Sequence, residues 1–330
     1  MVDTEKLDSI INDMLAKEVP QGQIITNNYT VQSASPETKI RLSKANGEFT
    51  AKQLQKDAIN SAQNEAKDNF KIYCKDNNIP YSENDLDLTP IKRIPAPIVS
   101  NGEVVAAESE FLKPTTTPNG KVVILNAGHG GYSDRTGYFD TGSYSFIKKA
   151  NGKYAPLLEY EKMNIYAEHT ADKLREKGYA VVITSGHSQT ISDQKSVSNL
   201  ISRLENGEKT SKKYNKNDIV FVSLHADSQP GMSGTGVCYD SNFSDDTQLA
   251  DILTSNLNKD DWIKASTSER NWNVPKKGLQ VLHQSENIPS VLVEVEYVNG
   301  SKAKNLDSLN FQKRFIDKLI DGLDEYLGLR

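Results

Sequence analysis

Short apolar runs alternate with amphipathic segments from residue 121 to the end of the chain, and this alternation limits the fold more than any other feature. We expect buried strands at 122–125, 180–184, 219–224, 237–239 and 290–295. Apolar residues recur at helical spacing between these runs, which predicts helices around 163–174, 197–204, 249–257 and 311–323. Strands that are apolar on both faces and separated by helices are typical of parallel sheets. We therefore predict an α/β domain with a mainly parallel, twisted sheet flanked by helices.

The chain changes character near residue 117. Five of its twelve prolines fall between Pro90 and Pro118, and proline removes a backbone donor and restricts the residue before it. We interpret residues 86–117 as an extended, proline-rich linker. Upstream, two apolar stripes within 7–15 and 54–73 predict helices. We therefore predict a partly helical adaptor or docking region with its own partner over residues 1–117, and a catalytic domain over 118–330.

Composition excludes several classes of protein. A chain of 330 residues has room for about two domains, and no apolar run reaches the ~18 residues of a membrane-spanning helix. A net charge of −5 argues against nucleic acid as the main partner. The first twenty residues are acidic and amphipathic, unlike a signal peptide. For the two cysteines, Cys74 and Cys238, we expect free thiols, with a disulfide as the alternative, and their number excludes a cysteine-based zinc site.

Residues that bind metals or transfer protons follow three of the predicted strands. His129 lies in the run Gly-His-Gly-Gly after the first strand, His225 follows the strand at 219–224, and Glu294 lies near the end of the last strand. A fourth candidate, Glu159, comes just before the first helix of the domain. Each residue alone could be a cap or a packing residue, but the carboxyl ends of parallel strands meet at one edge of a sheet. Two imidazoles and one carboxylate suit catalytic zinc, and a second carboxylate can then take a proton from water.

The order of these motifs resembles that of the zinc-dependent N-acetylmuramoyl-L-alanine amidases of the Amidase_3 type, over about residues 120–328. The matching segments are Gly128-His129-Gly130-Gly131, Asp140-Thr141-Gly142, Ser223-Leu224-His225-Ala226-Asp227 and Pro289-Ser290-Val291-Leu292-Val293-Glu294. The resemblance implies an amidase fold, one zinc ion (Zn²⁺) per chain, and hydrolysis of the amide between N-acetylmuramic acid and L-alanine of peptidoglycan by zinc-activated water. It also implies that His129 and His225 are zinc ligands and that Glu294 is the catalytic acid–base residue.

Two positions have competing candidates. The family pattern places the carboxylate ligand near both Glu159 and Glu161. Counting back about nineteen residues from Gly178, which closes the helix, favours Glu159, and the same register turns apolar residues toward the core. Glu296 competes with Glu294 for the catalytic role, because strand alternation would put both on one face. The match to Val-Leu-Val-Glu favours Glu294.

The sequence departs from the family pattern in three places. It has Asn126-Ala127 where the family usually has Asp-Pro, Thr184-Ser185 in place of Thr-Arg, and an insertion at 132–139. These departures bear on substrate preference more than on the type of reaction. Three further histidines match no motif, and we expect surface or structural roles for them: His169, His187 and His283.

Two other functions fit the same pattern. One is a structural or targeting component of a phage or injection assembly whose amidase domain is secondary, and the other is a zinc peptidase of different specificity. Peptidoglycan lies outside the membrane, so we expect action at the cell wall, in an extracellular or periplasmic setting. With no signal peptide visible, we interpret the chain as one whose leader was removed or one delivered by a phage or an injection machine.

Overall fold

The computed structural model describes residues 36–100, 103–105, 110–132, 139–184, 200–207, 213–271, 279–283 and 288–329. The stripe at 7–15, His187 and the first part of the helix predicted at 197–204 lie outside these residues. The chain divides into two units, Met1–Ala45 and Asn46–Arg330. All the motifs named above belong to the second unit.

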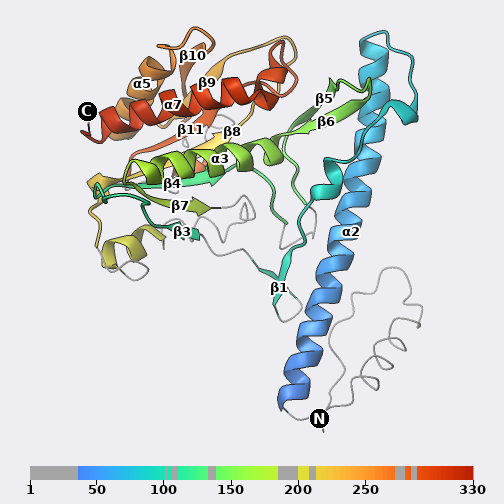
Figure 1. Cartoon of the computed structure of the whole chain (residues 1–330), viewed down its shortest axis with the longest axis horizontal. Coiled ribbons are helices and arrows are strands. Elements are labelled where there is room, and N and C mark those ends of the chain that lie inside the picture. Colours follow the sequence, from blue (N-terminus) through green and yellow to red (C-terminus); the bar gives the residue numbers. More distant parts are fainter. Residues whose placement is uncertain are drawn as a thin grey trace. The chain divides into compact units, whose positions relative to one another are not determined.

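A seven-stranded mixed sheet forms the centre of the second unit, in the order β10-β9-β11-β8-β4-β7-β3 (Figure 1). Its strands are β3 (Glu110–Leu112), β4 (Val122–Ala127), β7 (Ala180–Thr184), β8 (Ile219–His225), β9 (Thr235–Tyr239), β10 (Ala265–Glu269) and β11 (Ser290–Glu294). The four central strands β11, β8, β4 and β7 run parallel, whereas β9 and β3 pair antiparallel with their inner neighbours and β10 runs parallel with β9. The predicted α/β fold is confirmed.

Helices cover the sheet because its strands are apolar on both faces. The helices are α3 (Glu159–Glu176), α5 (Ser244–Leu257), α6 (Gln280–His283) and α7 (Leu309–Tyr326), with short 3-10 turns η1 (Glu83–Asp85), η2 (Ile91–Arg93), η4 (Lys216–Asp218) and η5 (Ala303–Asp307). Alternate residues of the central strands pack under α3, α5 and α7, among them Val123, Val222 and Val293. The residues between them face a second cluster that includes Ile124 and Phe221.

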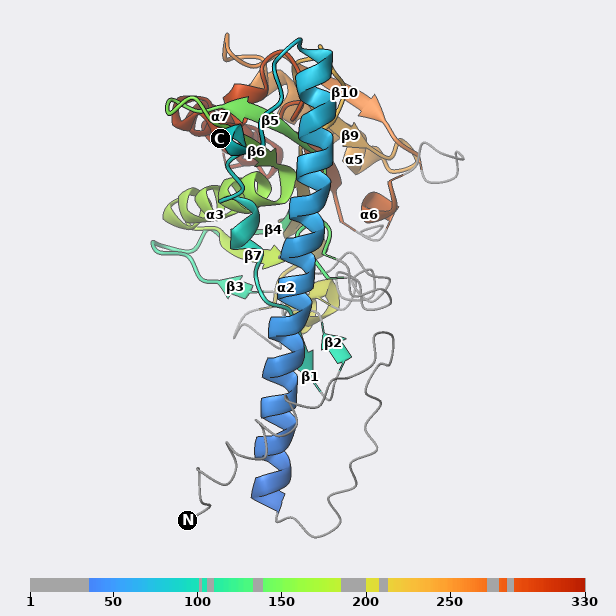
Figure 2. The same cartoon turned by 90° about the vertical axis from the view of Figure 1, so that its right-hand side faces the viewer.

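Two further elements lie outside the main sheet. The long helix α2 (Pro36–Asp76) contains the apolar stripe predicted at 54–73. A hairpin of β5 (Tyr144–Lys148) and β6 (Tyr154–Leu158) lies beside the C-terminal part of α2 (Figure 2). Its aromatic side chains pack against Phe70 and Cys74 of that helix. A second pair, β1 (Ile98–Ser100) and β2 (Glu103–Val105), forms a separate two-stranded sheet.

The boundary predicted between residues 117 and 118 does not coincide with the division of the chain into units. Within the predicted linker, β3 pairs with β7 as an edge strand of the main sheet. Upstream of β3, Ile91 and Ile94 are buried against Leu158. These contacts could not be predicted from the proline-rich sequence, because a three-residue edge strand and isolated apolar residues give no periodic pattern. Whether residues 118–330 form an independent catalytic domain stays a prediction.

Two expectations from composition can be compared with the described residues. Cys74 in α2 and Cys238 in β9 are both free and buried, as predicted. Burial is the main reason that the pKa of the Cys238 thiol is raised to about 11, so this thiol is protonated at neutral pH. Among the described helices, none has the length and apolar character to cross a membrane.

Candidate metal centre

The carboxyl ends of β4, β8 and β11 meet at one edge of the sheet. In the pairing of β11 with β8, Glu294 lies level with His225. On the other side of β8, the amide N–H of Gly128 donates to the carbonyl of Leu224 at 2.8 Å, and His129 follows directly. The three residues predicted at strand ends are therefore carried by neighbouring backbone segments.

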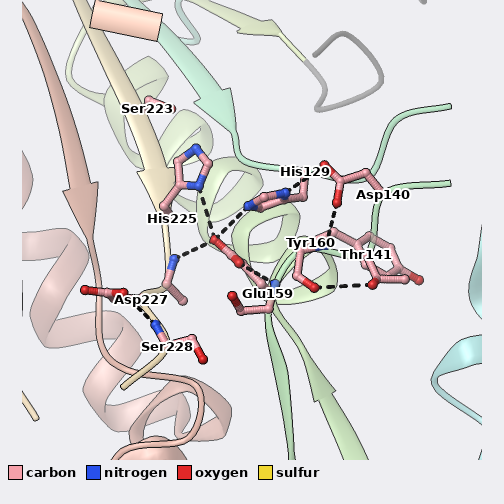
Figure 3. A network of polar contacts seen from close by, with 12 residues as sticks. His129, Asp140, Thr141, Glu159, Tyr160, Ser223, His225, Asp227 and Ser228 are labelled. Atoms are coloured by element: carbon pink, nitrogen blue, oxygen red, sulfur yellow. Dashed lines mark hydrogen bonds and ion pairs between the residues drawn. The ribbon is translucent and has the colours of Figure 1, made fainter. Parts of the chain in front are cut away.

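His129, Glu159 and His225 form a group of side chains that could hold one metal ion (Figure 3). One potential ligand atom of each lies within 4.8 Å of the others. Nε2 of His129 is 3.3 Å from Oε1 of Glu159, and Nδ1 of His225 is 3.1 Å from the same oxygen. Two imidazole nitrogens and a carboxylate oxygen thus converge on one point.

Asp140 fixes the orientation of the His129 ring. Its Oδ2 lies 2.8 Å from Nδ1 of His129, and its Oδ1 accepts the N–H of Gly142 at 2.9 Å. A carboxylate at Nδ1 favours the proton on that nitrogen, which leaves the lone pair on Nε2, the nitrogen that faces Glu159. In the sequence, Asp140 was noted only as part of a motif that matches the family. Its role in orienting the His129 ring is seen only in the structure.

Glu159 is buried and firmly held at the start of α3, with 3% of its side chain exposed. Its Oε2 accepts the N–H of Ser143 at 2.7 Å, and its Oε1 accepts the N–H of Ala226 at 2.9 Å. Burial alone would raise the pKa of Glu159, but hydrogen bonds and charge from His129 and His225 hold it well below its usual range. The carboxylate is therefore ionised at neutral pH.

The centre favours positive charge. Burial would lower the pKa of His129, yet the carboxylates of Asp140 and Glu159 raise it to about 10. The buried carboxylate of Glu159 and the exposed one of Asp140 thus attract a cation to the space between the imidazoles. A bound metal ion would balance the negative charge of these carboxylates in place of the proton on His129.

Glycines keep the space around the centre open. A Cβ at Gly128 would lie 2.4 Å from Cε1 of His225, and a Cβ at Gly142 would lie 2.7 Å from Oε2 of Glu159. Gly142 also has a φ of +64°, a conformation that side chains disfavour. The site therefore requires glycine at these positions. Its donor set, two imidazoles and one carboxylate, fits zinc rather than calcium or magnesium, which prefer oxygen ligands.

The two candidates for the carboxylate ligand have different surroundings. Glu159 lies beside both histidines, whereas Oε1 of Glu161 lies 2.5 Å from Nη1 of Arg93. Glu161 thus belongs to an ion pair outside the metal group.

Glu294 and Glu296 also differ. Oε2 of Glu294 is buried without a hydrogen-bond partner among the described residues. Oε1 of Glu296 accepts the N–H groups of Gly234 at 2.8 Å and Tyr297 at 3.0 Å. Because β11 ends at Glu294, strand alternation does not extend to Glu296, and the expectation that both side chains share one face stays a prediction.

A buried polar network beneath the centre was not predicted. Nδ2 of Asn126 donates to Oγ1 of Thr184 at 2.9 Å, and Oδ1 of Asn126 accepts the hydroxyl of Ser223 at 2.8 Å. These bonds link β4, β7 and β8. One of the three residues, Asn126, is a position where the sequence departs from the family pattern, and its side chain is hydrogen-bonded at both ends.

The remaining histidines lie apart from this centre or outside the described residues. Nδ1 of His169 is 3.1 Å from Oε1 of Gln312, which joins α3 to α7. This contact agrees with the structural role expected for His169. The side chain of His283 and all of His187 lie outside the part that the structure describes.

Comparison with known proteins agrees with the motif pattern. Residues 123–325 match the Amidase_3 family, described as N-acetylmuramoyl-L-alanine amidase. The uncharacterized protein YqiI of Bacillus subtilis (strain 168) is 29% identical over 211 residues, which are 63% of this chain and 85% of that protein.

Two of the similar solved structures are N-acetylmuramoyl-L-alanine amidases. The amidase AmiC2 of Nostoc punctiforme is 23% identical, with a TM-score of 0.41 over 64% of this chain and 99% of its own. The catalytic domain of CwlV from Bacillus (Paenibacillus) polymyxa var. colistinus is 24% identical, with a TM-score of 0.43 over 64% of this chain and 99% of its own.

Proposed function

This chain belongs to the Amidase_3 family of N-acetylmuramoyl-L-alanine amidases, and we propose that it works with one zinc ion held by His129, Glu159 and His225. It is a peptidoglycan hydrolase that cleaves the amide between N-acetylmuramic acid and L-alanine. The observation that carries the metal proposal is the convergence of two imidazole nitrogens and one carboxylate oxygen within 4.8 Å.

The protein supplies a rigid set of ligands for this ion. When bound, zinc supplies Lewis-acid chemistry, polarising the amide carbonyl and lowering the pKa of a coordinated water. Asp140 keeps the Nδ1 proton of His129 in place, so that Nε2 is available as a ligand atom. The backbone N–H groups of Ser143 and Ala226 hold the carboxylate of Glu159 in one orientation.

Glu294 is the residue to which we assign proton transfer. It accepts a proton from the attacking water at its carboxylate and returns that proton to the leaving amine. Burial, with the nearby negative charges of Glu159 and Asp227, raises the pKa of Glu294 to about 8. A pKa near neutrality lets one carboxyl group both take up and release a proton. Glu296 has no such freedom, because its oxygen is engaged by two backbone N–H groups.

Metal analysis and product analysis together test this proposal. The purified chain should contain about one zinc ion, and the substitutions His129→Ala and His225→Ala should remove it. Purified muropeptides should release free stem peptides that begin with L-alanine. Full zinc content in both variants would contradict the ligand set. Cleavage elsewhere in the stem would favour a zinc peptidase, and zinc binding without cleavage would favour a structural component.

For residues 1–117 the sequence predicts a docking role. We propose that its part Met1–Ala45 carries this role, because residues from Asn46 onward belong to the unit that carries the motifs. We also propose that the enzyme acts outside the membrane, where its substrate lies. A chain of residues 46–330 should retain hydrolysis of purified peptidoglycan and lose binding to the docking partner.

A further inference from the structure

A segment far upstream of the metal centre packs against residues that flank two of the proposed ligands. We call residues 54–95 the N-terminal segment; it comprises the C-terminal part of α2 with η1 and η2. One apolar cluster joins this segment to the residues around the metal centre. Its buried members are Ala58, Ala66, Ile91, Ile94, Tyr132, Leu158 and Tyr160.

This cluster holds the chain on both sides of Glu159. Leu158 and Tyr160 are the residues directly before and after Glu159, and both are buried in the cluster. Next in the same helical turn, Glu161 pairs with Arg93 of the N-terminal segment at 2.5 Å. The first turn of α3, which begins with the proposed ligand, therefore packs directly against the N-terminal segment.

The same cluster reaches the loop of His129. Tyr132 follows His129 by three residues, and its hydroxyl donates to the carbonyl of Pro95 at 2.7 Å. The ring of Phe139 contacts the rings of Tyr132 and Tyr160, with centroid distances of 5.0 and 5.1 Å. One set of aromatic contacts thus connects the His129 loop, the start of α3 and the N-terminal segment.

A second apolar cluster joins the N-terminal segment to the β5–β6 hairpin. The ring of Phe70 lies 5.1 Å from that of Phe146 and 5.3 Å from that of Tyr154. The N–H of Asp87 donates to the carbonyl of Tyr154 at 2.7 Å, and Asn69 donates to the hydroxyl of Tyr144.

The two ends of this hairpin meet at the proposed ligand. Tyr144, the first residue of β5, lies opposite Leu158, the last residue of β6. Ser143, just before the hairpin, donates its N–H to Oε2 of Glu159, and the N–H of Glu159 donates to the carbonyl of Ser143 at 3.0 Å. Any shift of the hairpin therefore moves the groups that orient this carboxylate.

We propose that the N-terminal segment positions Glu159 and His129, so that its packing sets the affinity of the centre for zinc. The inference rests on the proposed function, since it concerns the same ligands. Its residues are positioning residues: they act through the backbone of the ligands and contact neither metal nor substrate. Groups that orient metal ligands commonly change metal affinity by about 10- to 100-fold when removed. Because linkage is reciprocal, zinc must in turn stabilise the packing of the N-terminal segment.

A pair of tyrosine substitutions in the full chain tests this coupling. Tyr132→Phe removes only the hydroxyl that bonds to Pro95. Tyr179→Phe is the control, since its hydroxyl donates to Asp324 at 2.6 Å. Tyr179 lies beyond the far end of α3, a helix of 18 residues and thus about 27 Å long. The dissociation constant is measured by titrating the metal-free protein with Zn²⁺ against a chelating indicator.

We expect Tyr132→Phe to weaken zinc binding by up to about tenfold, the scale of one lost hydrogen bond, and Tyr179→Phe to leave it unchanged. A second pair of substitutions should give a larger effect. Phe70→Leu removes an aromatic ring of the N-terminal segment, and Phe315→Leu, the control, removes one from the buried face of α7. Phe70→Leu should weaken zinc binding more than Phe315→Leu does. Equal dissociation constants within both pairs would overturn the inference.

Hydrogen exchange provides a readout that does not depend on activity. Zinc should slow exchange of the Asp87 amide, which bonds to the hairpin, in the wild-type chain. An exchange rate unaffected by zinc would also contradict the coupling. A wild-type chain that binds no zinc would overturn both the proposed function and this inference. Normal zinc binding that is insensitive to all four substitutions would overturn the inference alone.

Discussion

Glu159 and Glu161 lie two residues apart in the first turn of one helix, yet they face different partners. Glu159 lies beside His129 and His225, while Glu161 pairs with Arg93. Each residue of an α-helix is rotated by about 100° from the one before, so residues two apart lie about 200° apart around the helix axis. One carboxylate therefore belongs to the group that could hold a metal ion, and the other to the contact with the N-terminal segment.

Substitution of each glutamate should separate these roles. Glu159→Gln should lower zinc affinity by more than about 100-fold, because losing a ligand costs more than losing a group that orients one. Glu161→Gln keeps the side-chain volume and removes only the charge opposite Arg93, so we expect a much smaller loss. Zinc titration of both metal-free variants measures the difference. Similar losses in the two variants would contradict the assignment of Glu159 as the ligand.

The proton-transfer role of Glu294 predicts loss of rate without loss of metal. Glu294→Gln should fold and bind zinc normally while the rate falls by ~10²–10⁴-fold. Glu296→Gln should be much milder, since a glutamine oxygen can still accept the two backbone N–H groups. Zinc content and the rate of muropeptide cleavage are measured on both. Loss of zinc in Glu294→Gln would make Glu294 a ligand, and the reverse ranking of rates would transfer the role to Glu296.

A truncated chain tests the boundary predicted from sequence. A fragment of residues 118–330 lacks β3 and the N-terminal segment, so it would expose Leu158, Tyr160 and the aromatic side chains of the hairpin. We expect it to have a lower thermal midpoint and weaker zinc binding than residues 46–330. Calorimetry and zinc titration compare the two fragments. Equal values would show that residues 118–330 fold as the independent domain predicted from sequence.

The buried carboxyl of Asp246 predicts a pH dependence of stability. Burial raises its pKa from 3.8 to about 7 in the folded protein. Between these values the folded state keeps the proton that the unfolded state has lost, so the free energy of unfolding falls as pH rises from about 4 to 7 and stays low above. Each pKa unit of difference corresponds to ~1.4 kcal/mol.

Asp246→Asn should therefore be more stable than the wild type at pH 8 and similar to it at pH 4. The substitution keeps an oxygen that can accept the N–H of Ser290, which bonds to Asp246 at 2.7 Å. Asp245→Asn, at the exposed neighbouring position, is the control. Thermal denaturation with a chelator present removes the contribution of metal binding. A pH profile of the thermal midpoint that is parallel in Asp246→Asn and the wild type would contradict this role of Asp246.

The grouping of the candidate ligands could be expected from the sequence, because these residues lie in short segments at the ends of apolar strands. His129, His225 and Glu294 need only the parallel order of β4, β8 and β11 to come together. The choice of Glu159 over Glu161 was based on counting back along the helix from Gly178. In each case the position depends on local pattern and on one general property of parallel sheets.

Other features depend on contacts that no local pattern reveals. Phe70 packs on Tyr154 from a helix far upstream in the chain. The edge strands β3 and β10 were missed because one has three residues and the other, Ala-Ser-Thr-Ser-Glu, is polar and mostly exposed. Long-range packing of aromatic side chains and one-sided pairing at sheet edges thus escaped prediction. The aromatic packing includes residues that flank Glu159 and follow His129.

Reconstitution of the metal-free enzyme tests directly whether amide hydrolysis requires one zinc ion per chain. The full chain is stripped of metal, zinc is added in steps, and release of stem peptides from purified muropeptides is followed at each step. We expect no cleavage before zinc is added, then a linear rise in rate and a plateau at about one zinc per chain. The His225→Ala variant should show no recovery. Full activity of the metal-free chain, or recovery of that variant at the same zinc ratio, would contradict this requirement.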